Sequence, residues 1–386
     1  MLARWPRGRS FGALVAPLVL AGGLAALASS GAPESACGTW TAARSPNPGG
    51  SSRANFLYGV AALSSRDAWA VGESFKVGAG QSLVLRWDGS AWHRVASPSP
   101  RDAALYGVAA TSPRTAWAVG GYSGGTLVLH WNGTAWKHVT SPNPGGSASN
   151  SLFSVAALSS RDAWAVGYNT GTNRTLVLHW NGTAWRRVAV PTPRLSLGAE
   201  LDGVAATSPR NAWAVGNYYN GREGSGEGYR TLILHWNGTA WKRVPSPNAP
   251  HSGENYLSAV TATSPASAWA VGEYFIRGGT ADRTLILRWD GAAWKRVASP
   301  NPGTADNLLN DLAATSATNA WAVGEYNNFI TRVRFSSHRT LVAHWNGTAW
   351  RQVTSPNPGG SANDISLRGV TATSARNAWA VTLHCG

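Results

Sequence analysis

Tryptophan recurs along this chain at regular intervals and in three sequence contexts. Seven copies stand in the tetrapeptide Ala-Trp-Ala-Val, namely Trp69, Trp117, Trp164, Trp213, Trp269, Trp321 and Trp379. Six precede an Asn-Gly or Asp-Gly pair, namely Trp87, Trp131, Trp180, Trp236, Trp289 and Trp345. A third set follows that pair at a constant step, namely Trp92, Trp136, Trp185, Trp241, Trp294 and Trp350, and an isolated Trp40 joins it. A repeat of about 50 residues therefore determines the architecture.

Each repeat reads as four short strands joined by turns. The first is rich in small residues, as in Gly203–Ser208, and the second is the Ala-Trp-Ala-Val-Gly segment. The third alternates, so that Leu127 and Leu129 share one face. The Asn-Gly pair before the fourth strand is a strong hairpin signal. Because no segment has a helical period, we expect an all-β chain of four-stranded antiparallel units.

Four-stranded units of this length predict a β-propeller, whose radial closure protects the strand edges. Seven Ala-Trp-Ala-Val segments predict seven blades. The chain begins on a lone fourth-strand signature, Thr39-Trp40, and its last repeat supplies a first and a second strand, Gly369–Val381. We therefore expect the N-terminal strand to close the ring by joining the last blade. That blade lacks a recognisable third strand, so an incomplete seventh blade is the alternative.

The first 28 residues have the pattern of a signal peptide. Arginines precede the apolar run Phe11–Ala28, which ends on the small-residue site Ala26-Leu27-Ala28. A transmembrane anchor is the alternative, but glycine and proline interrupt the run, and no later stretch approaches the roughly 18 apolar residues of a span. We therefore expect a secreted, extracellular protein with no membrane span in the mature chain, whose propeller occupies residues 37–386.

Only two cysteines occur, Cys37 and Cys385, and they lie at the two ends of the mature chain. Export would place both in an oxidising compartment. They are therefore candidates for a disulfide that joins the ends.

The repeat motifs also resemble those of known propellers. The segments Asn211–Gly216 and Thr231–Trp236, followed by Trp241, resemble repeats of bacterial secreted propellers related to photosystem II assembly and stability factors. The resemblance to kelch and sialidase-type propellers is looser, because the Asp-box of sialidases is not matched. The resemblance implies a propeller over nearly all of residues 37–386. It implies little about function, since propellers host binding, assembly and hydrolysis alike.

The two faces of the predicted propeller differ in loop length. From the second-strand to the third-strand tryptophan the interval is 18, 14, 16, 23, 20 and 24 residues, whereas across the Asn-Gly turn it is always five. Binding residues tend to occupy loops that a scaffold leaves free to vary. We therefore expect any ligand on the variable-loop face, the face that carries the connections between second and third strands.

Aromatic and charged residues in these loops are the candidate ligand-binding residues. They are Tyr122, Tyr168, Tyr218, Tyr274, Tyr326, Glu73, Glu273, Glu325, Arg277 and Arg332. Aromatic rings stack on apolar surfaces while charged groups fix orientation, which suits an extracellular glycan or a protein as partner. The alternative is that each tyrosine packs against the rim of its own blade. We expect the chain to be a monomer.

The formal charge of +15 raises nucleic acid as a partner. The basic residues, however, follow the fourth-strand tryptophan, as in Lys242 and Arg243, on the predicted outermost strand. Charges on exposed edge strands prevent aggregation, and the aromatic pattern of single-strand grooves is missing. We therefore expect no specific nucleic-acid binding.

Histidine recurs at one repeat position, but Arg86 and Arg288 fill this position in two other repeats. Because arginine cannot ligate zinc, we expect neither a metal nor a cofactor.

A non-enzymatic binding or assembly scaffold is the function these features favour. The alternative is an extracellular glycoside hydrolase or lyase with Glu273 and Glu325 as acid and base, which would need carboxyl groups about 5 Å or about 6.5–9.5 Å apart. The resemblance to photosystem-related factors implies a third option, an assembly chaperone with a stable protein partner.

Overall fold

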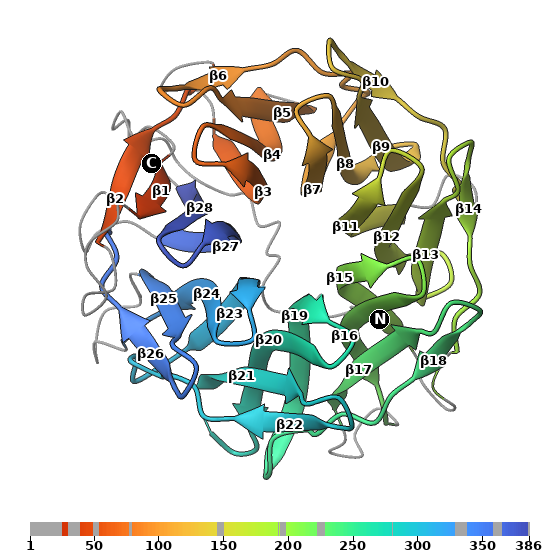
Figure 1. Cartoon of the computed structure of the whole chain (residues 1–386). Coiled ribbons are helices and arrows are strands. Elements are labelled where there is room, and N and C mark those ends of the chain that lie inside the picture. The colour runs from red at the N-terminus through yellow and green to blue at the C-terminus, as the bar shows by residue number, and fades with distance from the viewer. Residues whose placement is uncertain are drawn as a thin grey trace.

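The strands of the computed structural model are arranged radially around a central axis (Figure 1). The structure describes residues 25–29, 39–48, 54–76, 79–144, 150–191, 193, 198–221, 228–279, 281–328, 338–357 and 365–384. These ranges contain strands and turns but no helix, so none of them holds a helix that could span a membrane. The predicted all-β propeller with four-stranded antiparallel blades is confirmed.

Five sheets have four antiparallel strands each. The first contains β7 (Ala104–Ser112), β8 (Thr115–Tyr122), β9 (Gly125–Trp131) and β10 (Trp136–His138). The second contains β11 (Asn150–Ser159), β12 (Asp162–Asn169), β13 (Arg174–Trp180) and β14 (Trp185–Arg187). The third contains β15 (Ala199–Ser208), β16 (Asn211–Tyr219), β17 (Tyr229–Trp236) and β18 (Trp241–Arg243). The fourth contains β19 (Ser252–Ser264), β20 (Ser267–Ile276), β21 (Asp282–Trp289) and β22 (Trp294–Val297). The fifth contains β23 (Asn307–Ser316), β24 (Asn319–Tyr326), β25 (Arg339–Trp345) and β26 (Trp350–Val353).

The sixth sheet has eight strands and two halves. One half is β3 (Asn55–Ser64), β4 (Asp67–Lys76), β5 (Ala79–Trp87) and β6 (Trp92–Arg94). The other half is β27 (Ile365–Ser374) and β28 (Asn377–His384), with β1 (Ala25–Ser29) and β2 (Trp40–Arg44) from the N-terminal region. A single residue pair, Leu383 with Phe56, joins the halves.

The prediction of seven separate blades is therefore wrong in number, because the structure has six sheets. The strands expected for the first and the last blade lie in the one eight-stranded sheet, since β28 pairs with β3. The sequence predicts one N-terminal strand at this place, and the structure has two: β1 lies between β28 and β2. Most of β1 belongs to the predicted signal peptide, so its removal would take this strand away.

Tryptophan rings pack between consecutive repeats of the sequence. At six of these places a second-strand tryptophan contacts the third- and fourth-strand tryptophans of the next repeat. Trp213, for example, lies 5.0 Å from Trp289 and 5.2 Å from Trp294, whose ring is perpendicular to it. Where the N-terminal strands meet the fifth sheet, Trp40 is the one tryptophan of the described residues whose ring contacts Trp321, because β1 has no tryptophan. We call these contacts the tryptophan interfaces.

The recurring histidine and arginine position has a packing role at these interfaces. The His235 ring stacks 4.2 Å from Trp213, and the Arg288 guanidinium lies 5.1 Å from the Trp269 ring. Burial of this ring lowers the pKa of His235. In the described ranges no cluster of histidine, cysteine and carboxylate residues could hold a metal ion.

The turn between the third and fourth strands is built the same way in the repeats that carry Asn-Gly-Thr. The Asn237 side-chain oxygen accepts the N–H groups of Thr239 and Ala240, both at 3.0 Å. Gly238 adopts a φ of +96°, which favours glycine. This turn geometry accounts for the repeated Asn-Gly-Thr sequence.

Candidate functional site

Each innermost strand contains a β-bulge at the same place, near the variable-loop end of the central axis. The register shifts by one residue there, between Leu57 and Gly59 in the first such strand. The bulged residues are Tyr58, Tyr106, Phe153, Asp202, Ser258, Asn310 and Arg368. Bulges reorient side chains and are common beside functional sites. We call these residues the axis ring.

Aromatic residues dominate one side of the axis ring. Tyr106 lies between Tyr58 and Phe153, with ring centroids 5.3 and 5.9 Å away. The contacts continue outward from Tyr58 to Phe56 at 6.4 Å and from Phe56 to Phe75 at 5.9 Å. All five side chains keep part of their surface exposed, and Phe75 is 36% exposed. These five residues form an aromatic ladder from the axis to the edge of the face.

A buried carboxylate lies against this ladder. The Tyr58 hydroxyl donates a hydrogen bond of 2.5 Å to Glu73. Burial raises the pKa of Glu73, while the bond from Tyr58 opposes that increase. Glu73 is at the end of β4, so the second strand and the first strand supply one tyrosine–carboxylate pair between them.

A second group of tyrosines and carboxylates lies across the axis, on β15, β17 and β19. The Tyr256 hydroxyl donates to Glu254 at 2.9 Å, and the Tyr229 ring lies 5.0 Å from that of Tyr256. Tyr168 is close enough to share this environment, because burial and the charge of Glu200 raise its pKa to about 12.

The third group is charged. Glu273 is 5% exposed, and burial together with the charges of Asp282 and Glu325 raises its pKa well above the ordinary value. The Arg368 guanidinium lies 3.9 Å from Glu325 and donates to the Asn310 side chain at 3.5 Å. Arg368 is thus the one basic residue of the axis ring, which the structure describes in full.

Among the residues predicted from sequence, Glu73, Glu273 and Glu325 occupy equivalent positions at the ends of β4, β20 and β24. They lie beside the axis ring, whereas the Tyr168 hydroxyl donates to the Asn173 side chain of its own blade at 2.7 Å. Three of the five predicted tyrosines pack outward instead. Tyr218 accepts a hydrogen bond of 2.7 Å from Arg243, the Arg296 guanidinium lies 5.6 Å from the Tyr274 ring, and Tyr122 contacts His138.

Tyr326 packs against a hydrophobic cluster formed by the fourth and fifth sheets. Tyr122, Tyr218 and Tyr274 thus contact the fourth strand of their own blade, as the alternative interpretation expects, whereas Tyr326 packs between two blades. Arg277 donates its backbone N–H to the His251 carbonyl at 3.0 Å, just beyond the end of β20. The predicted residues Arg332, Cys37 and Cys385 lie outside the described residues.

The axis ring is not among the residues predicted from sequence, because it lies on the innermost strands and the ligand site was expected in the loops. A signal was present: the residue before Gly59 and its equivalents differs from repeat to repeat, while the leucine before it recurs. Glu200 and Tyr256, on the innermost strands β15 and β19, were not predicted for the same reason.

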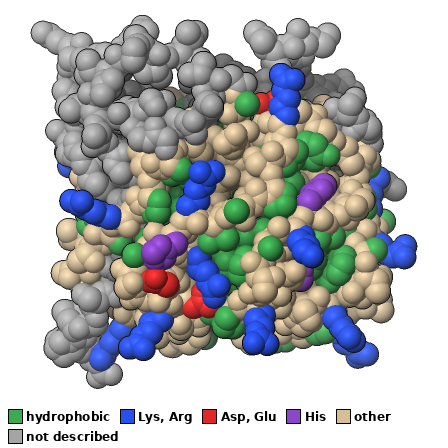
Figure 2. Space-filling model, turned by 90° about the horizontal axis from the view of Figure 1, so that it is seen from above, with side chains coloured by type: hydrophobic (Ala, Val, Ile, Leu, Met, Phe, Trp, Pro, Cys, Tyr) green, Lys and Arg blue, Asp and Glu red, His purple; other side chains and the backbone are tan. Residues whose placement is uncertain are grey.

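The outer wall is unlike this region. On each fourth strand the tryptophan is buried and the next two residues are exposed, as in Trp185–Arg187, which confirms the predicted exposed outer strand. Figure 2 shows lysine and arginine side chains spread singly over one side of the molecule.

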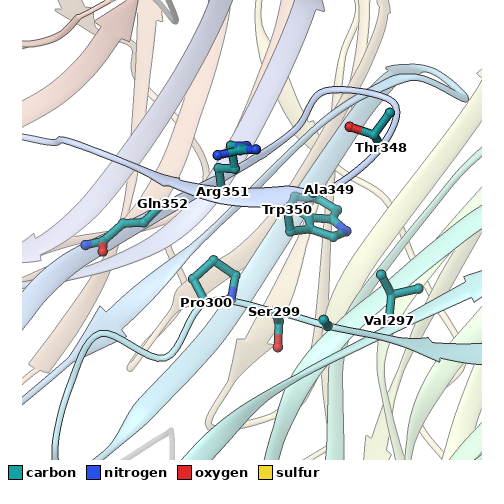
Figure 3. Close-up of a pocket in the computed structure, with 9 residues that line it drawn as sticks. Val297, Ser299, Pro300, Thr348, Ala349, Trp350, Arg351 and Gln352 are labelled. Carbon is teal, nitrogen blue, oxygen red and sulfur yellow. The ribbon is translucent and has the colours of Figure 1, made fainter.

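A groove of about 480 Å³ lies on this outer wall between the segments Val297–Pro300 and Thr348–Gln352, with Pro300 and Trp350 on its two sides (Figure 3). None of the predicted ligand residues lines it.

Comparisons with known proteins show a similarity of fold. No protein family model matches the chain, and no curated protein matches it. YCF48 from Cyanidioschyzon merolae superposes with a TM-score of 0.52 at 15% identity, over 88% of this chain and 95% of that one. YCF48 bound to D1 peptide superposes with a TM-score of 0.50 at 13% identity, over 86% of this chain and 91% of that one. The WD40 propeller domain of Doa1 superposes with a TM-score of 0.53 at 9% identity, over 85% of this chain and 92% of that one. At these identities the likeness shows a shared propeller fold alone, which is the fold that the sequence resemblance implies.

Proposed function

We propose that this chain is a secreted, non-enzymatic scaffold that binds a segment of another protein at the variable-loop end of its axis. The observation that carries this proposal is the aromatic ladder, in which five rings in mutual contact remain partly exposed. Contiguous exposed aromatic surface marks interaction sites, because burying it on binding is favourable. The pattern of residues 1–28 supports secretion.

The propeller neighbours support a protein as the partner. One of the YCF48 structures is bound to D1 peptide, so a propeller of similar fold holds a peptide. An extended segment fits an axis-end site, since side chains on its two sides can contact the ladder and the opposite side of the ring at once. A stable partner would also agree with an assembly role.

A glycoside hydrolase or lyase is the second candidate, and the raised pKa of Glu273, caused by burial, favours it. A raised pKa suits a carboxyl group for the role of general acid. Glu325, which lies 3.9 Å from Arg368, would be the second carboxyl group. Hydrolysis of a polysaccharide by the purified chain, lost in Glu273→Gln, would establish this function in place of the scaffold.

A random peptide library displayed on phage tests the scaffold. The full chain is the bait, and the double variant Tyr58→Ala with Tyr106→Ala is the comparison. We expect enriched peptides that bind the wild-type chain and lose most of their affinity for the variant, while circular dichroism shows that the variant is folded. The change Asp290→Asn, in a turn on the opposite face, is the control and should leave binding intact.

Two outcomes would contradict this proposal. One is the enrichment of peptides that bind the double variant as well as the wild-type chain. The other is the failure of any peptide to enrich. If the chain then binds glycans on an array and needs Tyr58 and Tyr106 to do so, the ligand is a glycan and the protein-binding proposal is wrong.

A further inference from the structure

We infer that the partner segment is basic: an extended peptide that presents lysine or arginine beside apolar side chains to the axis ring. This inference rests on the proposed function and names the chemistry of its ligand. It starts from the distribution of charge between the inner and outer strands.

Taken together over all repeats, the two inner strands carry a net negative charge, although the chain as a whole is positive. The whole chain has 33 lysine and arginine residues against 18 carboxylates. The inner strands β3, β4, β7, β8, β11, β12, β15, β16, β19, β20, β23, β24, β27 and β28 hold nine of those carboxylates but only two of the basic residues, Lys76 and Arg368. The carboxylates are Asp67, Glu73, Asp162, Glu200, Asp202, Glu254, Glu273, Asp311 and Glu325.

Seven of these nine carboxylates lie at the variable-loop end of their strands, beside the axis ring. They are Glu73, Glu200, Asp202, Glu254, Glu273, Asp311 and Glu325. Partly buried charges are screened by salt far less than charges on the open surface. A ligand that enters the axis ring therefore meets a negative environment on a protein that is positive elsewhere.

One of these carboxylates is buried without a partner. Glu273 is 5% exposed and, among the described residues, has neither a hydrogen bond nor an ion pair, although the charge of Arg368 acts on it from a distance; Glu73 and Glu254 accept hydrogen bonds from tyrosines. A buried carboxylate without a partner is costly, and a cation that pairs with it removes that cost. Glu273 is thus the strongest position in the ring for a ligand cation.

The tyrosines next to the carboxylates add a second means of binding a cation. Lysine and arginine bind over aromatic faces within about 6 Å of the ring, and a neighbouring carboxylate strengthens the attraction. Tyr229 and Tyr256 stack beside Glu254, and Tyr58 contacts Glu73. The aromatic ladder on the other side of the ring supplies the apolar surface for the rest of the segment.

Arg368 shows that a guanidinium fits at this place. It lies between the Glu325 carboxylate at 3.9 Å and the Asn310 amide oxygen at 3.5 Å, and its charge acts on Tyr58. The chain therefore already contains the combination of carboxylate, amide and tyrosine around an arginine that we assign to the ligand.

Fluorescence anisotropy with three labelled peptides tests the inference on the full chain. The basic peptide is Gly-Leu-Lys-Phe-Arg-Leu-Gly; the second has glutamate for both basic residues, and the third has serine for the apolar residues. We expect the basic apolar peptide to bind about tenfold or more tightly than either of the others, a difference of about 1.4 kcal/mol or more. Its affinity should fall as salt is raised.

The variant Glu254→Gln with Glu273→Gln should weaken the basic peptide by about tenfold, because it removes two carboxyl groups that can pair with a cation and keeps the shape of both side chains. The control Asp290→Asn removes a charge from the opposite face and should leave binding unchanged. Equal binding of the acidic peptide, no binding of the basic peptide, or an unchanged affinity in the double variant would overturn the inference.

The phage selection separates this inference from the proposed function. If the enriched peptides are acidic or uncharged and still need Tyr58 and Tyr106, the chain binds proteins and the basic ligand is wrong. If no peptide is enriched, both fail together.

Discussion

The tryptophan interfaces and the axis ring use the same repeat in opposite ways. At the interfaces one arrangement recurs, with perpendicular ring pairs such as Trp213–Trp294 and Trp164–Trp241 at 5.2 and 5.1 Å. In the axis ring, by contrast, the bulged position holds tyrosine, phenylalanine, aspartate, serine, asparagine and arginine. Identical positions build the scaffold, and the positions that differ carry what is specific to this protein.

The largest expected effect comes from removing a ring at a tryptophan interface. Trp213 is fully buried, so Trp213→Ala should lower the free energy of unfolding by about 3–5 kcal/mol. Tyr106→Ala, in the partly exposed axis ring, should lower it far less. Urea unfolding followed by tryptophan fluorescence measures both, and equal losses would mean that the two regions do not differ in role.

The pH dependence of stability tests the protonation of Asp311, a carboxylate at a position of the innermost strand that is glycine in several other repeats. Asp311 stands where other repeats have Gly59, Gly107 and Gly203, and burial raises its pKa to about 7. The folded state therefore binds a proton that the unfolded state releases near pH 4. This contribution to stability is full below about pH 4 and is lost as pH rises to about 7, roughly 2–4 kcal/mol in all.

Asp311→Asn should flatten that decline, as measured by urea unfolding at pH 5 and pH 7.5. Asp290→Asn is the control, because hydrogen bonds and Lys295 hold the pKa of Asp290 well below this range. An equally steep decline in Asp311→Asn would show that the Asp311 carboxyl is ionised in the folded protein.

A smaller difference should separate the closing interface from the others. Among the described residues the Trp40 ring contacts one other aromatic ring, that of Trp321, while Trp241 contacts both Trp164 and Trp236. Trp40→Ala should therefore cost about 1 kcal/mol less than Trp241→Ala, since one aromatic pair contributes about that much. Thermal unfolding of the two variants measures the difference, and an equal or larger cost for Trp40→Ala would contradict this account of ring closure.

The smallest effect is expected in the Asn-Gly turns, which lie on the face opposite the variable-loop face. Asn237→Ala removes two hydrogen bonds to backbone N–H groups that are exposed to water, so we expect a loss of about 1 kcal/mol. Peptide binding should not change. A loss of binding in this variant would place the ligand on the wrong face.

The sequence predicts the strands and the turns because each depends on neighbours in the chain. Alternation in Leu127–Trp131 and the Asn-Gly pair are local signals, and the structure follows both. The number of sheets is not local: it depends on the pairing of Leu383 with Phe56, which are far apart in the sequence. The place of β1 between β28 and β2 is a long-range pairing of the same kind.

The candidate site is predicted in part for a similar reason. The sequence analysis expects Glu73, Glu273 and Glu325 in the variable loops, and the structure has them within β4, β20 and β24, toward the variable-loop end of each strand. The sequence cannot show that Tyr218 turns outward to Arg243, because that contact joins a second strand to a fourth strand 25 residues later. The bulge that presents Tyr58 arises from pairing between strands, which a pattern of alternation does not reveal.

The most direct test of the central claim is to locate a bound peptide. A selected peptide that carries a photoreactive phenylalanine analogue would be cross-linked to the full chain, and the attachment site would be found by mass spectrometry. We predict attachment to the inner strands β3, β7 and β19, at or beside Tyr58, Tyr106 and Tyr256. Attachment confined to the outer strands β10, β14 or β18 would contradict the account.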